Sequence, residues 1–213
     1  MIHLLTTIYP VRSFDRLQEI RICVERNMHN PLINSIVVFA ENVDPTDDGY
    51  SFLEHPKVQL VHITKRPTYR EFFAHAREHY SEQLVAVCNS DVYFDETLAQ
   101  ASRITSDEMW CLCRYNIMVD GKLELQGRGG DGSADAWIFR APLKSFEDDI
   151  TLGVNGCDSY LAQKAAKAGI ALYNPCFSVI LRHMHHDAER NAEPDGNSYW
   201  KAPDYGYYCV KPC

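Results

Sequence analysis

Polar and acidic residues follow directly after the apolar run 84–88, in the order Asn89, Ser90, Asp91. A carboxylate at the end of a buried strand can bind a hard divalent cation. Mg²⁺ or Mn²⁺ in proteins typically takes one or two carboxylates, while phosphate oxygens fill other positions. Such a metal would neutralise a diphosphate. The structural alternative is that Asp91 caps the helix expected near Glu96 or stabilises a turn, a common local use of Asp.

Histidines are concentrated in the stretch RHMHHDAER, near the end of the chain. On a strand, His183 and His185 face the same side, and either can ligate a metal. A solvent-exposed histidine cluster is the alternative. The string also partly matches the HxHxDH pattern of metallo-β-lactamase-type hydrolases through His183, His185 and Asp187, with Ala188 at the last ligand position.

Two further carboxylates are candidates for sugar binding or catalysis. Asp135 follows a glycine-rich stretch and precedes Trp137, which could offer the flat apolar face on which sugars stack. Asp135 is suited to bind a sugar hydroxyl or to act as general base or nucleophile, and a turn or helix cap is the alternative. Asp158 falls in the first turn of an expected helix, where the helix dipole alone can explain it, although that end also favours an anion.

The apolar runs predict the scaffold that must position these residues. Short apolar runs without polar alternation are typical of strands covered on both faces, and helical periodicity separates them. In order, the first half predicts strand 2–8, a helix capped by Ser13, strands 35–41 and 58–63, helix 69–80 and strand 84–88. The predicted fold class is therefore α/β, Rossmann-like, with a mostly parallel sheet.

The second half is less regular. The run 109–119 and the segment KLELQ flank Asp120-Gly121, a hairpin signal. A strand AWIFR, a helix closed by Gly169 and a last strand FSVILRHMHH follow. We expect one domain over residues 1–213, either complete or a piece of a larger protein, with 1–95 as the nucleotide-binding half and 96–213 as the acceptor and metal-completing half.

In an open parallel sheet, ligands bind at the carboxyl ends of the strands. Polar residues stand at or just after the ends of the first three predicted strands: Thr6, Thr7, Glu41, Lys65 and Arg66. A basic pair beside a carboxylate-held metal would suit a nucleoside diphosphate. The alternative is that Lys65 and Arg66 are ordinary solvated charges.

Composition limits the possible partners and the compartment. The net charge of −8 argues against nucleic acid or an anionic membrane surface as the main partner. The chain shows neither an apolar run of membrane-span length nor a signal-peptide pattern, so we expect a cytoplasmic protein. The eight cysteines lack CxxC spacing and lie mostly in apolar runs, which predicts reduced core thiols.

The order of the motifs resembles that of a nucleotide-sugar glycosyltransferase of the GT-A fold. The motifs are NSD with a trailing FD, then SADAWIFR, GCDSYLAQKAAKAG and the late HMHH. More closely, the chain is similar to the small glycosyltransferase domains encoded by large chlorella viruses and their bacterial relatives. The resemblance spans nearly the whole chain and is strongest from Leu84 to His186. The motifs are short, and their order carries the resemblance.

The resemblance implies a GT-A fold with a central, mostly parallel sheet flanked by helices. It places Asn89, Ser90 and Asp91 at the DxD-type motif, with Asp91 the expected ligand of Mn²⁺ or Mg²⁺ and Asn89 replacing the first acid. A late histidine commonly completes such a site, and His183 or His185 matches, with His185 preferred. The remaining implied positions are sugar-binding or catalytic carboxylates at Asp135 and Asp158, and base and ribose contacts at Thr6, Thr7, Glu41 and Arg66.

The implied activity is transfer of a sugar from a UDP-sugar to an oligosaccharide or glycoprotein glycan, with no nucleic-acid partner and no membrane span. Glucose and rhamnose are candidate sugars, and the viral likeness tilts the expected stereochemistry slightly toward retention. A viral protein would act in the host cytoplasm.

Three alternatives come from other classes. A zinc hydrolase would use His183, His185 and Asp187 and would not need Asp91. A noncatalytic carbohydrate-binding module would use Trp137, Trp200 and the tyrosines of the tail. A sugar-nucleotide pyrophosphorylase shares the sheet architecture, but no glycine-rich signature for a nucleoside triphosphate lies near the first strand.

Overall fold

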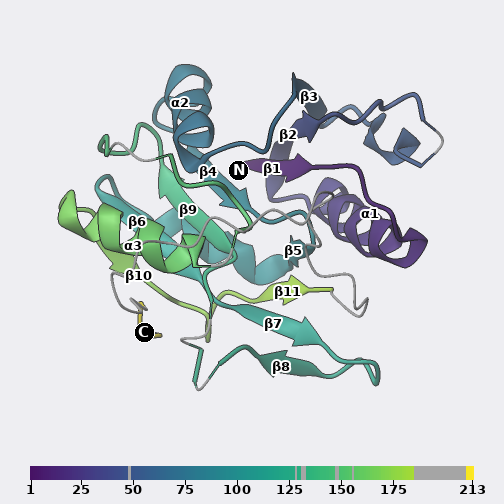
Figure 1. Ribbon diagram of the computed structural model, residues 1–213. Coiled ribbons are helices and arrows are strands. Elements are labelled where there is room, and N and C mark those ends of the chain that lie inside the picture. Colours follow the sequence, from purple (N-terminus) through teal and green to yellow (C-terminus); the bar gives the residue numbers. More distant parts are fainter. Residues whose placement is uncertain (48, 128, 131–132, 147–148, 155, 185–209) are drawn as a thin grey trace.

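The computed structural model describes residues 1–213 except 48, 128, 131–132, 147–148, 155 and 185–209. Figure 1 shows a large sheet with helices on both sides and a smaller sheet beneath it. The helices are α1 (Phe14–His29), α2 (Tyr69–His79) and α3 (Cys157–Lys167), with 3-10 helices η1 (Ser51–Leu53) and η2 (Glu96–Arg103). None of the helices described is both long and apolar enough to cross a bilayer.

The large sheet has seven strands in the order β10-β6-β9-β4-β1-β2-β3. The strands are β1 (Ile2–Ile8), β2 (Ile33–Glu41), β3 (Val58–Ile63), β4 (Leu84–Cys88), β6 (Glu108–Leu112), β9 (Ala136–Arg140) and β10 (Ala171–Tyr173). Strand β9 runs antiparallel to β4 and β6, and every other neighbouring pair is parallel. The prediction of a mostly parallel sheet flanked by helices is confirmed.

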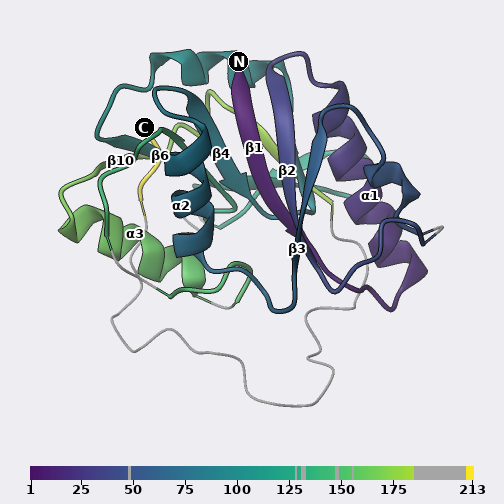
Figure 2. The same ribbon diagram turned by 90° about the horizontal axis from the view of Figure 1, so that it is seen from above.

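The sheet divides the hydrophobic core into two layers because successive strand residues point to opposite faces. In β1, Leu4 packs in the layer that holds Ile20 and Val24 of α1. Its neighbour Leu5 packs in the other layer, which contains residues of α2 and α3. Figure 1 shows α2 above the sheet and α1 below it, and Figure 2 looks down on the strands from above. Both faces of β1 are therefore covered, as its unbroken apolar run requires.

Local signals in the sequence explain where the helices begin and end. The Ser13 side chain accepts a hydrogen bond from the Arg16 backbone N–H at the start of α1, as predicted. Thr68 and Glu71 form a reciprocal capping box at the start of α2. Gly169 follows α3 with a positive φ of 80°, a conformation that suits glycine at the end of a helix.

The run 109–119, which precedes the hairpin signal in the sequence, does not form a single strand. It divides into β6 and β7 (Arg114–Ile117), which belong to different sheets. Between them, the backbone N–H of buried Cys113 donates to the side-chain oxygen of Asn174. This side-chain bond between distant residues replaces a ladder bond and lets the chain leave the large sheet.

The second sheet has the order β5-β11-β7-β8, with β5 (Val92–Phe94), β8 (Leu123–Leu125) and β11 (Leu181–His183). The predicted hairpin at Asp120-Gly121 is confirmed, since β7 and β8 pair antiparallel. Strand β11 pairs antiparallel with β5 and parallel with β7. This sheet therefore brings His183 next to the segment that follows β4.

Candidate functional site

A small open cleft of about 80 Å³ lies at the carboxyl ends of β1 and β4, the edge where an open parallel sheet binds ligands. Its lining contains five residues predicted from the sequence and three that were not: Thr7, Arg66, Asn89, Ser90 and Asp91, with Tyr9, Leu152 and Gly153. The convergence of strand ends that lie far apart in the sequence thus brings these predicted polar residues together.

Asp91 is the most constrained of these residues. Its side chain is nearly buried, and Oδ2 lies 2.6 Å from Nη2 of Arg16 and 3.2 Å from Nε2 of His183. The alternative role as a helix cap is wrong, because Asp95 caps η2 by accepting a hydrogen bond from the Thr97 backbone N–H. Asp91 is therefore held in place by an arginine and a histidine from opposite ends of the chain.

Sequence reasoning missed Arg16, which lies in the first turn of α1. Its Nη1 donates to Glu19 Oε2 at 3.0 Å, and the residue is only 6% exposed. Burial is the largest single influence and would lower the pKa of the guanidinium, but the charges of Asp91 and Tyr9 and the hydrogen bonds to Asp91 and Glu19 together outweigh it and raise the pKa of Arg16 above its ordinary value. An arginine in an amphipathic helix normally points to solvent, so the sequence held no signal for this contact.

The proton positions on His183 follow from its neighbours. Arg114 Nε donates to Asn116 Oδ1 at 3.1 Å, and a guanidinium can only donate, so this atom of Asn116 is an acceptor. His183 Nδ1 lies 2.9 Å from the same Oδ1 and must therefore carry the hydrogen. The 3.2 Å contact of Nε2 with Asp91 Oδ2 is a hydrogen bond only when Nε2 also carries a hydrogen, because a carboxylate accepts, and a cation bound by both residues would take the place of that hydrogen.

Asp91 and His183 fit a pair of ligands for a divalent cation. Neighbouring ligands of one octahedral Mg²⁺ ion lie about 3 Å apart, and these two atoms are 3.2 Å apart. A ligating histidine usually donates its other N–H to an acceptor, as His183 does to Asn116. Among the described residues, no third His, Cys, Asp or Glu completes a cluster. His185, the residue preferred from the sequence, lies outside the described residues, as does Asp187.

Asp135 lies beside the metal motif on a neighbouring strand end. Its Oδ1 accepts hydrogen bonds from Arg114 Nη1 at 2.7 Å and from Asn89 Nδ2 at 3.0 Å. Its Oδ2 is buried without a hydrogen-bond partner among the described residues. Asn89, two residues before Asp91, thus holds a second carboxylate in place through its amide.

Asp158 is electrostatically linked to Asp135. Its Oδ2 accepts a hydrogen bond from the Ala134 backbone N–H at 3.1 Å, and Oδ1 accepts one from Ser159 N–H at 2.9 Å. Burial, followed by the charge of Asp135, raises the pKa of Asp158. The structure therefore couples the two carboxylates, and their catalytic roles stay predictions.

The polar residues at the other strand ends have different surroundings. The hydroxyl groups of Thr6 and Thr7 are buried and donate to backbone carbonyls of neighbouring strands. Arg66 Nε lies 3.4 Å from Glu41 Oε2, and its guanidinium stacks over Tyr9 at 4.8 Å from the ring centroid. Lys65 is exposed. Of the basic pair, only Arg66 lines the cleft described above.

The interpretation of Trp137 as a sugar-stacking surface is wrong. Its side chain is fully buried between strands and packs edge-on against Tyr69 in the core. Because β9 is covered on both faces, an aromatic residue in it contributes to packing rather than to a surface. Trp200, the other tryptophan considered, lies outside the described residues.

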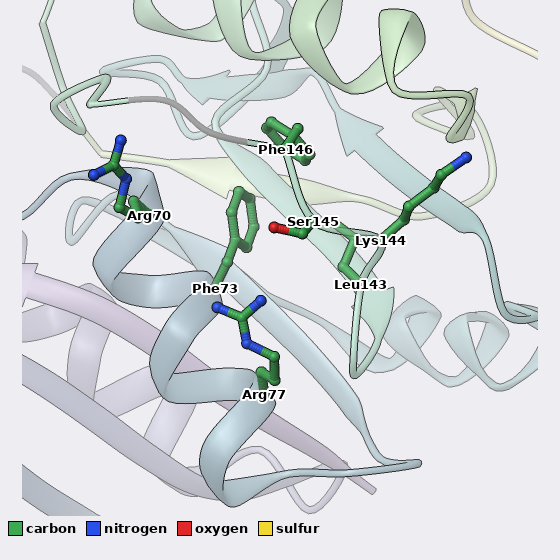
Figure 3. A pocket seen from close by; sticks show the side chains of 7 residues that line it. All are labelled: Arg70, Phe73, Arg77, Leu143, Lys144, Ser145 and Phe146. Carbon is green, nitrogen blue, oxygen red and sulfur yellow. The ribbon is translucent and has the colours of Figure 1, made fainter.

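Figure 3 shows a second pocket between α2 and the segment after β9, lined by Arg70, Phe73, Arg77, Leu143, Lys144, Ser145 and Phe146. None of the predicted site residues lines it. Arg70 forms an ion pair with Asp149 at 3.2 Å. Lys144 points away from Phe73, and its Nζ lies next to Gly169 at the end of α3. The basic side chains that line this pocket therefore do not converge on a single position.

No protein-family model matches the chain, and no curated protein matches it in sequence. Among solved structures, it is similar to a mannosyltransferase from Pyrobaculum calidifontis in complex with GDP-Man and Mn²⁺, with a TM-score of 0.58 and 15% identity. The match covers 89% of this chain and 58% of the mannosyltransferase.

A second match is 4-diphosphocytidyl-2C-methyl-D-erythritol synthase from Anaerococcus prevotii, with a TM-score of 0.44, 12% identity and coverage of 65% and 70% of the two chains. The mannosyltransferase match and the helix-flanked, mostly parallel sheet define the fold: the chain has a GT-A fold.

Proposed function

We propose that the protein is a glycosyltransferase that takes its sugar from a nucleotide-sugar donor and uses a divalent cation bound by Asp91 and His183. The observation that carries this proposal is the 3.2 Å approach of Asp91 Oδ2 and His183 Nε2 next to the cleft of a GT-A fold. His183 comes from the half expected to complete the metal site. Mn²⁺ and Mg²⁺ are both candidates, and the similar mannosyltransferase was solved with Mn²⁺.

The donor would lie along the cleft with its diphosphate near Asp91. A bound cation would stabilise the negative charge that develops on the departing diphosphate. Arg66, stacked on Tyr9, and Thr7 line the part of the cleft that would receive the nucleoside. UDP remains our proposed nucleotide, with glucose or rhamnose as sugars. GDP is the necessary comparison, because the similar mannosyltransferase binds GDP-Man.

Asp135 and Asp158 would act on the sugars. Arg114 and Asn89 occupy Oδ1 of Asp135, which leaves the buried Oδ2 as an acceptor for a sugar hydroxyl. Burial and the charge of Asp135 raise the pKa of Asp158, which favours its protonated form and suits a carboxyl group that takes part in proton transfer. The acceptor we propose is an oligosaccharide or glycoprotein glycan, with a slight preference for a retaining reaction.

The hydrolase and binding-module alternatives have less support. The hydrolase hypothesis makes Asp91 dispensable, whereas His183, its first proposed ligand, faces Asp91. The binding module relied partly on Trp137, which is buried. The likeness to viral glycosyltransferases stays a prediction.

The first test is calorimetric titration of the purified protein with UDP and with GDP, each with and without Mn²⁺. We expect metal-dependent binding of one nucleotide, and at least a tenfold loss of affinity in Asp91→Asn, since carboxylate ligation is removed. Asp95→Asn is the matched control, because Asp95 lies close by, caps η2 and does not line the cleft.

Folding must be checked alongside binding. Asp91→Asn leaves buried Arg16 without this counter-ion, and breaking a buried ion pair typically costs about 3–5 kcal/mol. Circular dichroism will set a temperature at which each variant is folded. Undiminished binding by folded Asp91→Asn would refute the metal assignment. A wild-type protein that binds neither nucleotide with any metal would refute the transferase proposal.

A further inference from the structure

Arg16 lies directly against the proposed cation ligand. Its Nη2 is 2.6 Å from Asp91 Oδ2, the same oxygen that faces His183. Its Nη1 contacts Glu19 Oε2 at 3.0 Å and the Met184 carbonyl at 3.4 Å. The part of the cleft lining that the structure describes does not include Arg16. Arg16 therefore approaches Asp91 from the protein interior.

A fixed positive charge in this position opposes a second one. A guanidinium keeps its proton in proteins, so Arg16 cannot relieve the conflict by becoming neutral. Two positive charges a few ångströms apart in a partly buried site repel each other strongly. Either the cation loses affinity for Asp91, or Arg16 must withdraw toward Glu19, its partner on the same helix.

A diphosphate reverses this balance. It brings negative charge and phosphate oxygens to the same place, and both Arg16 and a cation at Asp91 then gain a counter-charge. Because binding couplings are reciprocal, the cation would strengthen nucleotide binding by the factor by which the nucleotide strengthens cation binding.

We propose that Arg16 makes cation binding at Asp91 depend on the donor. Its charge weakens the binding of a divalent cation when the nucleotide is absent, and the diphosphate of the donor removes this effect. This inference rests on the proposed function. It makes Arg16 a specificity-determining residue that acts through Asp91.

The test measures Mn²⁺ binding through the electron paramagnetic resonance of free Mn²⁺, with and without the nucleotide that the wild type binds. The main variant is Arg16→Met combined with Glu19→Gln, which removes one positive and one negative charge and so keeps the formal net charge of the wild type. Arg16→Lys, which retains the positive charge, and Glu19→Gln alone are the controls. Circular dichroism confirms that each variant is folded.

We expect the wild type to bind Mn²⁺ alone at least tenfold more weakly than with nucleotide. The double variant should bind Mn²⁺ alone at least tenfold more tightly than the wild type, and the enhancement by nucleotide should shrink. Arg16→Lys and Glu19→Gln should remain close to the wild type.

Equal Mn²⁺ affinity of the folded double variant and the wild type would overturn the inference, while nucleotide binding by the wild type would still support the proposed function. Wild-type protein that binds Mn²⁺ equally well with and without nucleotide would also overturn it, and this result needs no variant. A wild type that binds no nucleotide would instead refute the proposed function, whereas tighter Mn²⁺ binding by the double variant would still support the role of Arg16.

Discussion

The surroundings of Asp158 in the folded protein favour the protonated form of its carboxyl group. Burial and the charge of Asp135 raise the pKa of Asp158, and backbone N–H groups of Ala134 and Ser159 only partly compensate. A raised pKa means that the folded protein binds this proton more tightly than the unfolded chain does. This contribution to stability is therefore lost as pH rises above about 4, the ordinary pKa of Asp.

Asp158→Asn should remove this pH dependence, because the amide does not ionise. We expect the variant to become more stable relative to the wild type as the pH rises above about 4, so that the difference between their free energies of unfolding increases in favour of the variant. Urea unfolding at several pH values measures it, and Asp149→Asn, which removes an exposed carboxylate, is the control. Parallel profiles for Asp158→Asn and the wild type would contradict the assignment.

At the scale of elements, the small sheet depends on one buried amide. Asn174 Oδ1 accepts from Cys113 N–H between β6 and β7, and Asn174 Nδ2 donates to the carbonyl groups of Gly130 and Val210. The side chain thereby joins the strand crossing, the glycine-rich segment and the end of the chain. These are the segments that hold β7, with Arg114 and Asn116, beside the site.

Substitution of Gly130, whose carbonyl group accepts a hydrogen bond from Asn174, tests how tightly this region is packed. Its φ is +89°, and a Cβ there would lie 2.8 Å from Cys176 Sγ and 2.9 Å from Pro212 Cγ. Gly129 has a similar φ of +79° but nothing within 4 Å of its Cβ position. Gly129→Ala should therefore cost about 1–2 kcal/mol from backbone strain alone. Gly130→Ala should cost a further 1–3 kcal/mol, roughly the penalty of overpacking.

Urea unfolding of the two glycine variants supplies the comparison, since the backbone strain common to both cancels in the difference. Equal losses in the two variants would show that the packing of Gly130 against Cys176 and Pro212 does not limit the space there.

At the scale of the whole molecule, folding buries most of the thiols. Cys23, Cys88, Cys111, Cys113, Cys157 and Cys176 are buried, and Cys213 is exposed. Burial raises the pKa of Cys157 to about 12 and that of Cys176 to about 11, so the reactive thiolate is scarce. The prediction of core thiols is confirmed for these six, whereas Cys209 lies outside the described residues.

Brief treatment of the folded protein with a thiol reagent should therefore label Cys213 at least tenfold faster than any of the six buried cysteines. Peptide mass mapping identifies the labelled positions. Guanidinium-unfolded protein, in which all eight cysteines should react, is the control. Rapid labelling of Cys157 or Cys176 in the folded state would contradict the burial of these thiols.

Continuous apolar runs allowed several strands to be predicted from sequence alone. Strands β1, β3 and β4 have the predicted bounds. Strands β1 and β4 are buried along their whole length, as continuous apolar runs require, whereas β3 lies at the edge of the sheet and exposes Gln59 and His62. The cleft position followed from the same pattern, since the carboxyl ends of parallel strands share one edge. Short strands such as β5 and β10, with three residues each, have no comparable pattern and were missed.

The amino-acid sequence by itself thus determined the α/β architecture and the edge that forms the cleft, and it predicted that Asp91 lies there. Only the tertiary structure decided which side chains surround Asp91. Arg16 and His183 lie 75 and 92 residues away from it along the chain, and no local periodicity encodes such ion pairs. Local patterns specify which face of a strand or helix is buried, whereas a polar network depends on how distant elements pack.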